Sequence, residues 1–514
     1  MSDWTAGYVA DVGYTFGTYA ELNPQRIKLA FLMAGLVPPE NGTACELGFG
    51  QGMSVNIHAA ASVTEWHGTD FNPSQAGFAR ELAAASGANL HLNDQAFSEF
   101  CLRTDLPEFD FIGLHGIFSW ISDENRRIIV DFVRRKLKVG GVLYISYNTQ
   151  PGWAGMAPVR DLLTEHANVM GAAGSGSLAR VDQSFNFVER LFATDPLFVR
   201  ANPNAKLRFE KAKEQNRAYL AHEYFNRDWV PIGFAHMARW LEPAKLTYAC
   251  SAHYHDHIDA INLSPEQQKL VAEIGDTHFA QTVRDFIVNQ TFRRDYWVRG
   301  ARRLSPLDQE ERLNACRIVM LTSREQVALK ITSPRGDVTL QETVYGPLLD
   351  MLADQGTHTI GELSERGARE HQVNKLQVLQ AVFILAGSGK VAVLQDDDVI
   401  ARAAPQAQKL NLHLCTLAKS STDFHEFALP ATGGSMTVDR FQQLFTLARA
   451  QSGKDDVEAW ASFAASVLAR QGQRIVIDGK PVESDEMQLR ELTKRAVQFR
   501  DHTLPMLRKL GAVA

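Results

Sequence analysis

Cysteine is scarce in this chain, and the few cysteines form no pattern that binds metal or crosslinks a fold. The 514 residues include five, an odd number, at wide spacing. Without a Cys-x-x-Cys pair or a regular ladder, a zinc ribbon and a disulfide scaffold are excluded. We expect buried thiols in a reducing compartment and no structural metal site.

Long hydrophobic runs and an excess of positive charge are also missing. Lys and Arg number 53 against 59 Asp and Glu, and the formal net charge is −6. This balance gives no electrostatic reason to expect a nucleic acid as a partner. No uncharged run approaches the length of a membrane span, and the N-terminus lacks the features of a signal peptide. We therefore expect a cytoplasmic protein without integral membrane contact.

The first third of the chain alternates short apolar runs with helical patterns. Such alternation is typical of an α/β fold with a doubly wound, Rossmann-like parallel sheet. Helices are predicted over Asn72–Ser86, with Asn72 as cap, and over Asp123–Lys138. The predicted strands are Thr43–Leu47, Trp66–Asp70, Asn89–Leu92, Phe109–Leu114 and Val142–Ser146.

After residue 153 the periodicity becomes mostly helical, which indicates accessory domains. From about residue 326 to 395 the expected order is strand, three helices and a wing strand, a winged-helix-like module. Its basic residues do not outnumber its acidic ones, so DNA binding is not expected. We predict four domains: 1–160 for the sheet, 161–320 helical, 321–400 winged-helix-like and 401–514 helical. Because the expected cofactor residues precede about residue 120, a chain ending near residue 300 should still bind the cofactor.

A glycine-rich turn directly follows the first predicted strand. It reads Glu46-Leu-Gly48-Phe49-Gly50-Gln-Gly52. Glycines at a strand-to-helix turn let the backbone bend tightly and approach a ligand. No Lys-Ser/Thr pair follows, so the turn does not resemble a phosphate-binding loop. Alone, this pattern is equally that of a plain tight turn.

Polar side chains at the ends of later strands strengthen the cofactor interpretation. Asp70 ends the second strand, where a carboxylate can accept hydrogen bonds from both hydroxyls of a ribose. Phe71 can cover an adenine ring, and Asp94 is placed to accept from the adenine amino group. The predicted cofactor-binding residues are Glu46, Gly48, Phe49, Gly50, Gly52, Asp70, Phe71, Asp94, Gln95 and His115.

Longer motifs resemble one family of bacterial enzymes. The strings His115–Trp120 and Ser146–Trp153, with the aromatic segment Tyr8–Tyr19, resemble methyltransferases that carry a methyltransferase regulatory domain. That group includes outer-membrane-protein lysine methyltransferases. Tyr219–Tyr224 is similar to a motif of the regulatory domain itself. The resemblance implies a class I methyltransferase fold, S-adenosylmethionine as cofactor and a protein lysine as methyl acceptor.

Aromatic side chains near the ends of the strands are candidates for the acceptor channel. A lysine must lose its proton before methylation, and an apolar, aromatic channel lowers the pKa of its ammonium group. Asn148 can orient the amine. An aromatic stripe is also what an ordinary core contains, so both interpretations stay open. The candidate catalytic residues are Tyr14, Tyr19, Trp120, Tyr147, Asn148 and Trp153.

Two histidine motifs lie outside this scheme. His253, His255 and His257 lack the carboxylate or cysteine partners of a metal centre, so a surface cluster is expected. His222 and Glu223 stand side by side in a helical motif, and we place them far from the sheet in a structural hydrogen bond.

The sequence thus predicts an S-adenosylmethionine-dependent methyltransferase that modifies lysine side chains of a protein. Two alternatives remain. The acceptor is a small molecule or a sugar, or the chain is a catalytically idle scaffold that only binds the cofactor. The sequence leaves open whether the chain forms a homodimer.

Overall fold

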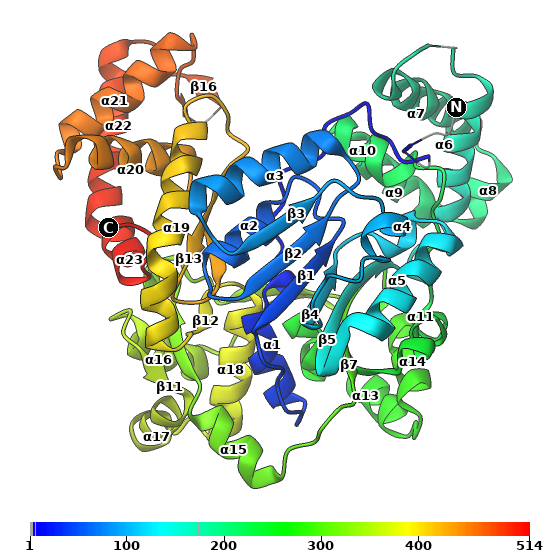
Figure 1. Cartoon of the computed structure of the whole chain (residues 1–514), viewed down its shortest axis with the longest axis horizontal. Helices are drawn as coiled ribbons and strands as arrows, with labels where there is room; N and C mark the ends of the chain where they lie inside the picture. The colour runs from blue at the N-terminus through cyan, green and yellow to red at the C-terminus, as the bar shows by residue number, and fades with distance from the viewer. Residues whose placement is uncertain (1–3, 6, 173, 478) are drawn as a thin grey trace.

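A seven-stranded sheet lies at the centre of the fold, in the order β3-β2-β1-β4-β5-β7-β6 (Figure 1). The computed structural model describes residues 4–5, 7–172, 174–477 and 479–514. Strands β1 to β5 run parallel, whereas β7 is antiparallel to β5 and to β6. The strands are β1 Thr43–Leu47, β2 Glu65–Thr69, β3 Leu90–Asn93, β4 Phe109–Leu114, β5 Leu137–Asn148, β6 Leu246–Ser251 and β7 Phe292–Arg299.

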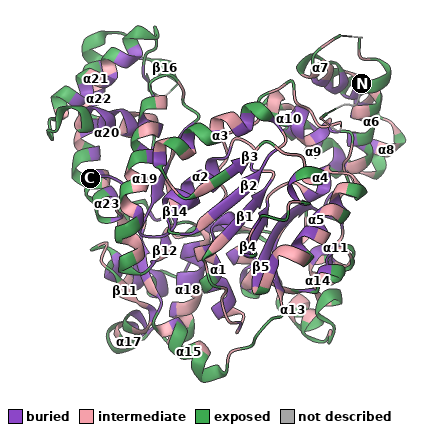
Figure 2. Cartoon of the chain, in the orientation of Figure 1, coloured by how far each residue is buried: buried purple, intermediate pink, exposed green. Residues whose placement is uncertain are grey.

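Successive side chains of each central strand point to opposite faces of the sheet, so they pack into two different hydrophobic cores. On β5, Tyr144 packs into a core with α1 (Pro24–Met33), α2 (Met53–Ala60) and α3 (Pro73–Ser86). Leu143 packs into the opposite core with α5 (Asp123–Lys136) and α11 (Phe234–Leu241). Both faces are covered by helices, and the central strands β1 and β4 are almost completely buried (Figure 2). The predicted doubly wound α/β sheet is confirmed.

Local signals explain where the covering helices begin and end. Asn72 caps α3 by accepting a hydrogen bond from the backbone nitrogen of Ser74, with proline in the first turn. Helix α5 has acidic residues in its first turn and three basic residues in its last, as the helix dipole favours.

Two strands of the sheet come from the segment that we expected to be a separate helical domain. β6 and β7 lie within residues 161–320, yet β7 pairs with β5 along its length. A boundary at residue 160 therefore cuts the sheet. The other proposed boundaries stay predictions. The remaining helices of this segment are α6 Ala157–Val169, α7 Ser177–Ala193, α8 Leu197–Ala201, α9 Pro203–Lys213, α10 Arg217–Tyr224, α12 Asp259–Asn262, α13 Pro265–Ala272 and α14 Thr277–Val288.

Helices also form where the winged-helix-like module was expected. They accompany a three-stranded antiparallel sheet in the order β11-β8-β12. The assignment as a winged helix stays a prediction. The elements of this segment are α15 Pro306–Asn314, β8 Arg317–Met320, β9 Lys330–Ser333, β10 Gly336–Thr339, α16 Glu342–Leu352, β11 His358–Thr359, α17 Ile360–His371, α18 Lys375–Gly387 and β12 Val391–Val393.

The C-terminal segment is mostly helical, as predicted, and it packs directly on the first helices behind the sheet. Apolar residues of α19, which lies beside α3 (Figure 1), share a core with Met53, Ile57 and Leu82. Its elements are α19 Asp397–Leu417, β13 Glu426–Leu429, β14 Gly434–Thr437, α20 Arg440–Ser452, α21 Val457–Arg470, β15 Val476–Ile477, β16 Lys480–Pro481, α22 Asp485–Gln498 and α23 Leu504–Lys509.

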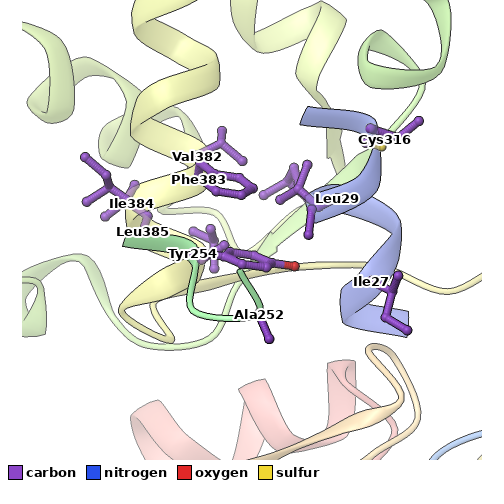
Figure 3. Close-up of a cluster of buried hydrophobic side chains, with 14 of the residues drawn as sticks. Ile27, Leu29, Ala252, Tyr254, Cys316, Val382, Phe383, Ile384 and Leu385 are labelled. Carbon is purple, nitrogen blue, oxygen red and sulfur yellow. The ribbon is translucent and has the colours of Figure 1, made fainter. Parts of the chain in front are cut away.

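A second shared core joins α1 to α18. Tyr254 stacks on Phe383 with ring centroids 4.4 Å apart, and Leu29 of α1 lies beside them (Figure 3). A chain ending near residue 300 would expose the apolar surfaces of α1, α2 and α3 to water. That such a chain would still bind the cofactor stays a prediction, and this packing argues against it. No helix among the described residues has the length and apolar character needed to cross a membrane.

Candidate functional site

A cavity lies at the carboxyl ends of β1, β2 and β4, beside the point where the strand order reverses. Ligands of open α/β sheets bind at this position. Side chains from the N-terminal segment close the cavity from the other side. Most of the predicted cofactor-binding residues line it: Glu46, Gly48, Phe49, Gly50, Asp70, Phe71, Gln95 and His115.

The glycine turn after β1 forms the floor of this cavity. Gly48 and Gly50 have φ angles of 72° and 58°, in the left-handed region where side chains with a Cβ are strained. A Cβ on Gly48 would lie 2.5 Å from Cδ1 of Ile117. The turn therefore requires glycine at both positions.

Asp70 fastens the glycine turn to the end of β2. Its Oδ2 accepts a hydrogen bond from the backbone nitrogen of Gly50 at 2.8 Å, and its Oδ1 accepts one from Asn72 at 3.0 Å. Burial raises the pKa of Asp70 to about 6, against the opposing effect of these hydrogen bonds. Each carboxylate oxygen still has a lone pair for a ligand hydroxyl.

Glu46 presents a buried carboxylate oxygen without a partner. The residue is 3% exposed, and its Oε2 has no hydrogen bond to any described residue. Burial, with the charge of Asp70, raises the pKa of Glu46 well above its usual value. A buried polar atom of this kind costs free energy unless a ligand satisfies it.

The charges around the cavity have one sign. Glu46, Asp70 and Asp228 line it, and the described lining residues include no lysine or arginine. Burial lowers the pKa of His115 to about 4, so this imidazole is neutral at neutral pH. The cavity is thus complementary to a ligand with positive charge and hydrogen-bond donors.

Aromatic rings form the wall opposite the glycine turn. Tyr19 stacks on His115 with ring centroids 3.6 Å apart, and Tyr14 and Trp120 also line the cavity. These three are the predicted acceptor-channel residues that the structure brings to the cavity. Sequence reasoning missed Trp4 and Tyr8 of the same wall, although Tyr8 belongs to the aromatic segment Tyr8–Tyr19.

The other candidate residues do not line the cavity. The exposed Asp94 pairs with Arg80 at 2.8 Å instead of facing an adenine site. At Gly52, the N-cap of α2, an added Cβ would lie 2.4 Å from Cβ of Ala79, so this glycine serves helix packing. Trp153 is buried in a separate core with Trp229.

Tyr147 and Asn148 are neighbours in β5 and therefore point to opposite faces of the sheet. The hydroxyl of Tyr147 donates to Oδ2 of Asp295 at 2.8 Å inside the core, so the structure contradicts a catalytic role. Nδ2 of Asn148 donates to Oε1 of Glu223 at 3.4 Å. Glu223 was expected far from the sheet, but the segment that follows it returns to the end of β5, where the backbone nitrogen of Ile232 donates to the backbone oxygen of Asn148 at 2.8 Å.

The histidines of both motifs form hydrogen bonds with residues of the chain. His222 bonds to the backbone oxygen of Val12 at 3.1 Å, which confirms the expected structural hydrogen bond. His253, His255 and His257 reach three different partners. Elsewhere, Glu65, His67 and His91 at the other end of β2 and β3 hold their ligand atoms within 4.8 Å of one another. Nε2 of His67 lies 3.1 Å from Oε1 of Glu65, so a hydrogen bond between these side chains accounts for this cluster.

Comparison with known proteins identifies the family. The family described as a predicted methyltransferase regulatory domain matches residues 216–299. Protein sll1526 of Synechocystis sp. is 37% identical over 513 residues, which is 99% of each chain. Protein RP028 of Rickettsia prowazekii is 28% identical over 221 residues, 42% of this chain and 85% of RP028.

A solved structure has the same fold along nearly the whole chain. PKMT2 from Rickettsia typhi, in complex with AdoHcy, matches with a TM-score of 0.67 and 16% identity, over 95% of this chain and 98% of PKMT2. The likeness therefore includes the accessory segments as well as the sheet. The chain belongs to the same family as protein sll1526, its residues 216–299 match the predicted methyltransferase regulatory domain, and its fold is that of PKMT2.

Proposed function

We propose that the cavity holds S-adenosylmethionine, with Asp70 on its ribose hydroxyls and Glu46 on its amino group. The unpartnered Oε2 of Glu46 carries this proposal, because the amino group supplies both the donor and the positive charge that this oxygen lacks. The sulfonium adds a second positive charge inside an acid-lined cavity. Phe71 lines the same cavity and offers its ring to the adenine.

Cofactor binding is expected to weaken as the pH falls. The ligand-free pKa of Asp70 is about 6, and the ribose hydroxyls bind its ionised form. The dissociation constant should therefore rise below pH 6, approaching about tenfold per pH unit. Burial raises the pKa of Asp70 in the folded chain, so the contribution of Asp70 to the stability of the ligand-free fold is lost as the pH rises through about 6. Binding of the cofactor to the ionised carboxylate offsets this loss of stability. Calorimetry with S-adenosylmethionine from pH 8 to 5 measures the trend.

The same titration of Asp70→Asn provides the control. This variant keeps an acceptor oxygen for Gly50 but cannot ionise, so its dependence on pH should be shallower and reflect only Glu46. An equal affinity of the wild-type chain at pH 7 and pH 5 would contradict the proposed part of Asp70.

We infer that the methyl acceptor is a lysine side chain of a protein. When bound, S-adenosylmethionine supplies a methyl group on a positively charged sulfur. The chain's own task is to position a neutral nucleophile and to exclude water. Tyr14, Tyr19 and Trp120 provide an aromatic wall that favours ammonium cations and lowers their pKa by burial. The sequence resemblance to lysine methyltransferases supports the same acceptor.

A transfer assay tests this acceptor. The purified chain is incubated with methyl-labelled S-adenosylmethionine and a bacterial lysate, which is then separated into macromolecules and small molecules. Label in protein, located on lysine by peptide mass spectrometry, is expected. Label only among small molecules would instead support a small-molecule or sugar acceptor. Cofactor binding without any transfer would support the idle scaffold.

A further inference from the structure

The regulatory-domain segment brings a carboxyl group to the aromatic wall of the cavity. Glu223 lies near the end of α10, inside the matched residues 216–299. Its Oε1 accepts the hydrogen bond from Asn148 at the carboxyl end of β5, and its backbone oxygen accepts one from Nε1 of Trp120 at 3.3 Å. Trp120 lines the cavity. A segment named for regulation therefore contacts the wall of the site.

No described basic residue forms an ion pair with Glu223. The guanidinium of Arg208 on α9 acts on Glu223 through its charge, but it donates to the backbone oxygen of Gly152 and lies 4.7 Å from the ring centroid of Trp153. Burial raises the pKa of Glu223 to about 7, although the hydrogen bond from Asn148 and the charge of Arg208 oppose this. A half-buried carboxylate is thus left without a cation.

The charge of Glu223 acts on tyrosines of two elements. Burial raises the pKa of Tyr8, Tyr14 and Tyr19 of the N-terminal segment, and the charge of Glu223 adds to each effect. The same causes act on Tyr219 and Tyr224 of α10. Among the described residues, these five tyrosines, Asn148 and Arg208 are coupled to Glu223 by charge or by a hydrogen bond.

Tyr219 marks the solvent side of this part of α10. It lies four residues before Glu223 and therefore on the same face of the helix. Tyr219 is 37% exposed, whereas His222 between them is buried.

We propose that Glu223 and Asn148, together with these tyrosines, form the binding site for the primary ammonium of the acceptor lysine. This proposal rests on the proposed lysine methylation. The carboxylate binds the ammonium, and the aromatic rings attract the same cation. Asn148 donates to Glu223 through its amide nitrogen, which leaves its amide oxygen for the amine.

Glu223 then accepts the proton that the ammonium must lose. Its pKa of about 7 lies closer to that of a buried amine than the pKa of an ordinary carboxyl group does. The neutral nitrogen bonds to the methyl carbon, whose bond to sulfur breaks with both electrons remaining on sulfur. The methylated ammonium departs, and the proton on Glu223 passes to water.

Glu223→Gln is the variant that tests this subsite, with Glu214→Gln as the matched control. Glutamine has the size of glutamate and still accepts from Asn148, so the fold is retained; Glu214 is exposed on the preceding turn. In Glu223→Gln, kcat on a lysine-containing substrate should fall at least about 100-fold. The wild-type rate should rise as the pH passes about 7 and Glu223 ionises, and this rise should be absent in Glu223→Gln. The affinity of the variant for the cofactor should stay within about twofold of the wild type. Glu214→Gln should match the wild type in all three readouts.

Binding of a simple amine separates this subsite from the proposed function. The chain, saturated with AdoHcy, is titrated with n-butylammonium and, separately, with the neutral 1-butanol. The wild type should prefer the amine at least about tenfold, and Glu223→Gln should lose that preference. A preference without transfer to lysine would overturn the proposed function and keep the subsite. No preference in the wild type, or unchanged turnover in Glu223→Gln, would overturn the subsite and leave methyl transfer intact.

Discussion

Asp70→Ala is expected to weaken the binding of S-adenosylmethionine at least about tenfold, which corresponds to about 1.4 kcal/mol. The variant removes a charge-assisted acceptor for two ribose hydroxyls. It also deprives the backbone nitrogen of Gly50 of its acceptor, so the glycine turn is less firmly held. Calorimetry on the purified variant measures the affinity, and thermal unfolding of the ligand-free chain shows whether the fold is kept.

Asp94→Ala is the matched control for this experiment. Asp94 also follows a strand of the sheet, but it pairs with Arg80 at the surface and does not line the cavity. Exposed ion pairs of this kind contribute little to stability. Its affinity should equal that of the wild type. Equal losses in both variants, or no loss in Asp70→Ala, would contradict the assignment of Asp70.

Gly50→Val is expected to lower cofactor affinity by at least about 100-fold while the chain stays folded. The φ angle of 58° strains any residue with a Cβ by roughly 1–2 kcal/mol, which lowers the stability of the folded chain. The branched side chain would also occupy space in the cavity, since a Cβ there lies 3.4 Å from the ring of Tyr14.

Gly87→Val separates these two causes. Gly87 has a φ angle of 66°, similar to that of Gly50, but no atom lies within 4 Å of an added Cβ. It ends α3 at the surface, away from the cavity. The same backbone strain should therefore lower stability without lowering affinity. If Gly50→Val bound the cofactor as well as Gly87→Val does, the glycine turn would not form the ligand's floor.

The parts of the site that lie on consecutive elements could be predicted from the local sequence. The strand before Glu46, the glycines and the acid at the end of β2 lie on consecutive elements with short turns, so their positions follow from the βα repeat. Asp94 was misplaced because the end of a strand does not determine which way the next loop turns. Here Arg80 of α3 holds the side chain at the surface.

The error at Tyr147 has a definite structural cause. The strand was predicted to end at Ser146, whereas β5 continues to Asn148. Residues of a continuing strand alternate between faces, so Tyr147 and Asn148 cannot both face the site. The apolar run ends before the strand does, because the last residues are held by pairing with β7. No pattern within β5 could predict this pairing.

Glu223 was missed for a related reason. Its helical motif is separated from β5 by a long stretch of helices, and backbone hydrogen bonds from Val230 to Ser119 and from Ile232 to Asn148 bring the segment back to the sheet. Strand β7 carries Arg293 and Asp295 in its interior, joined by a buried ion pair at 2.9 Å. Because these charged residues interrupt the apolar pattern of β7, a search for apolar runs does not find this strand.

A crystal structure of the chain with AdoHcy tests the central claim most directly. The account predicts the nucleoside at the carboxyl ends of β1 and β2, its ribose hydroxyls bonded to Asp70 and its amino group to Oε2 of Glu46. The sulfur should face Tyr19 and Trp120 across the cavity. A ligand bound elsewhere, or one whose amino group leaves Oε2 of Glu46 unpartnered, would contradict the account.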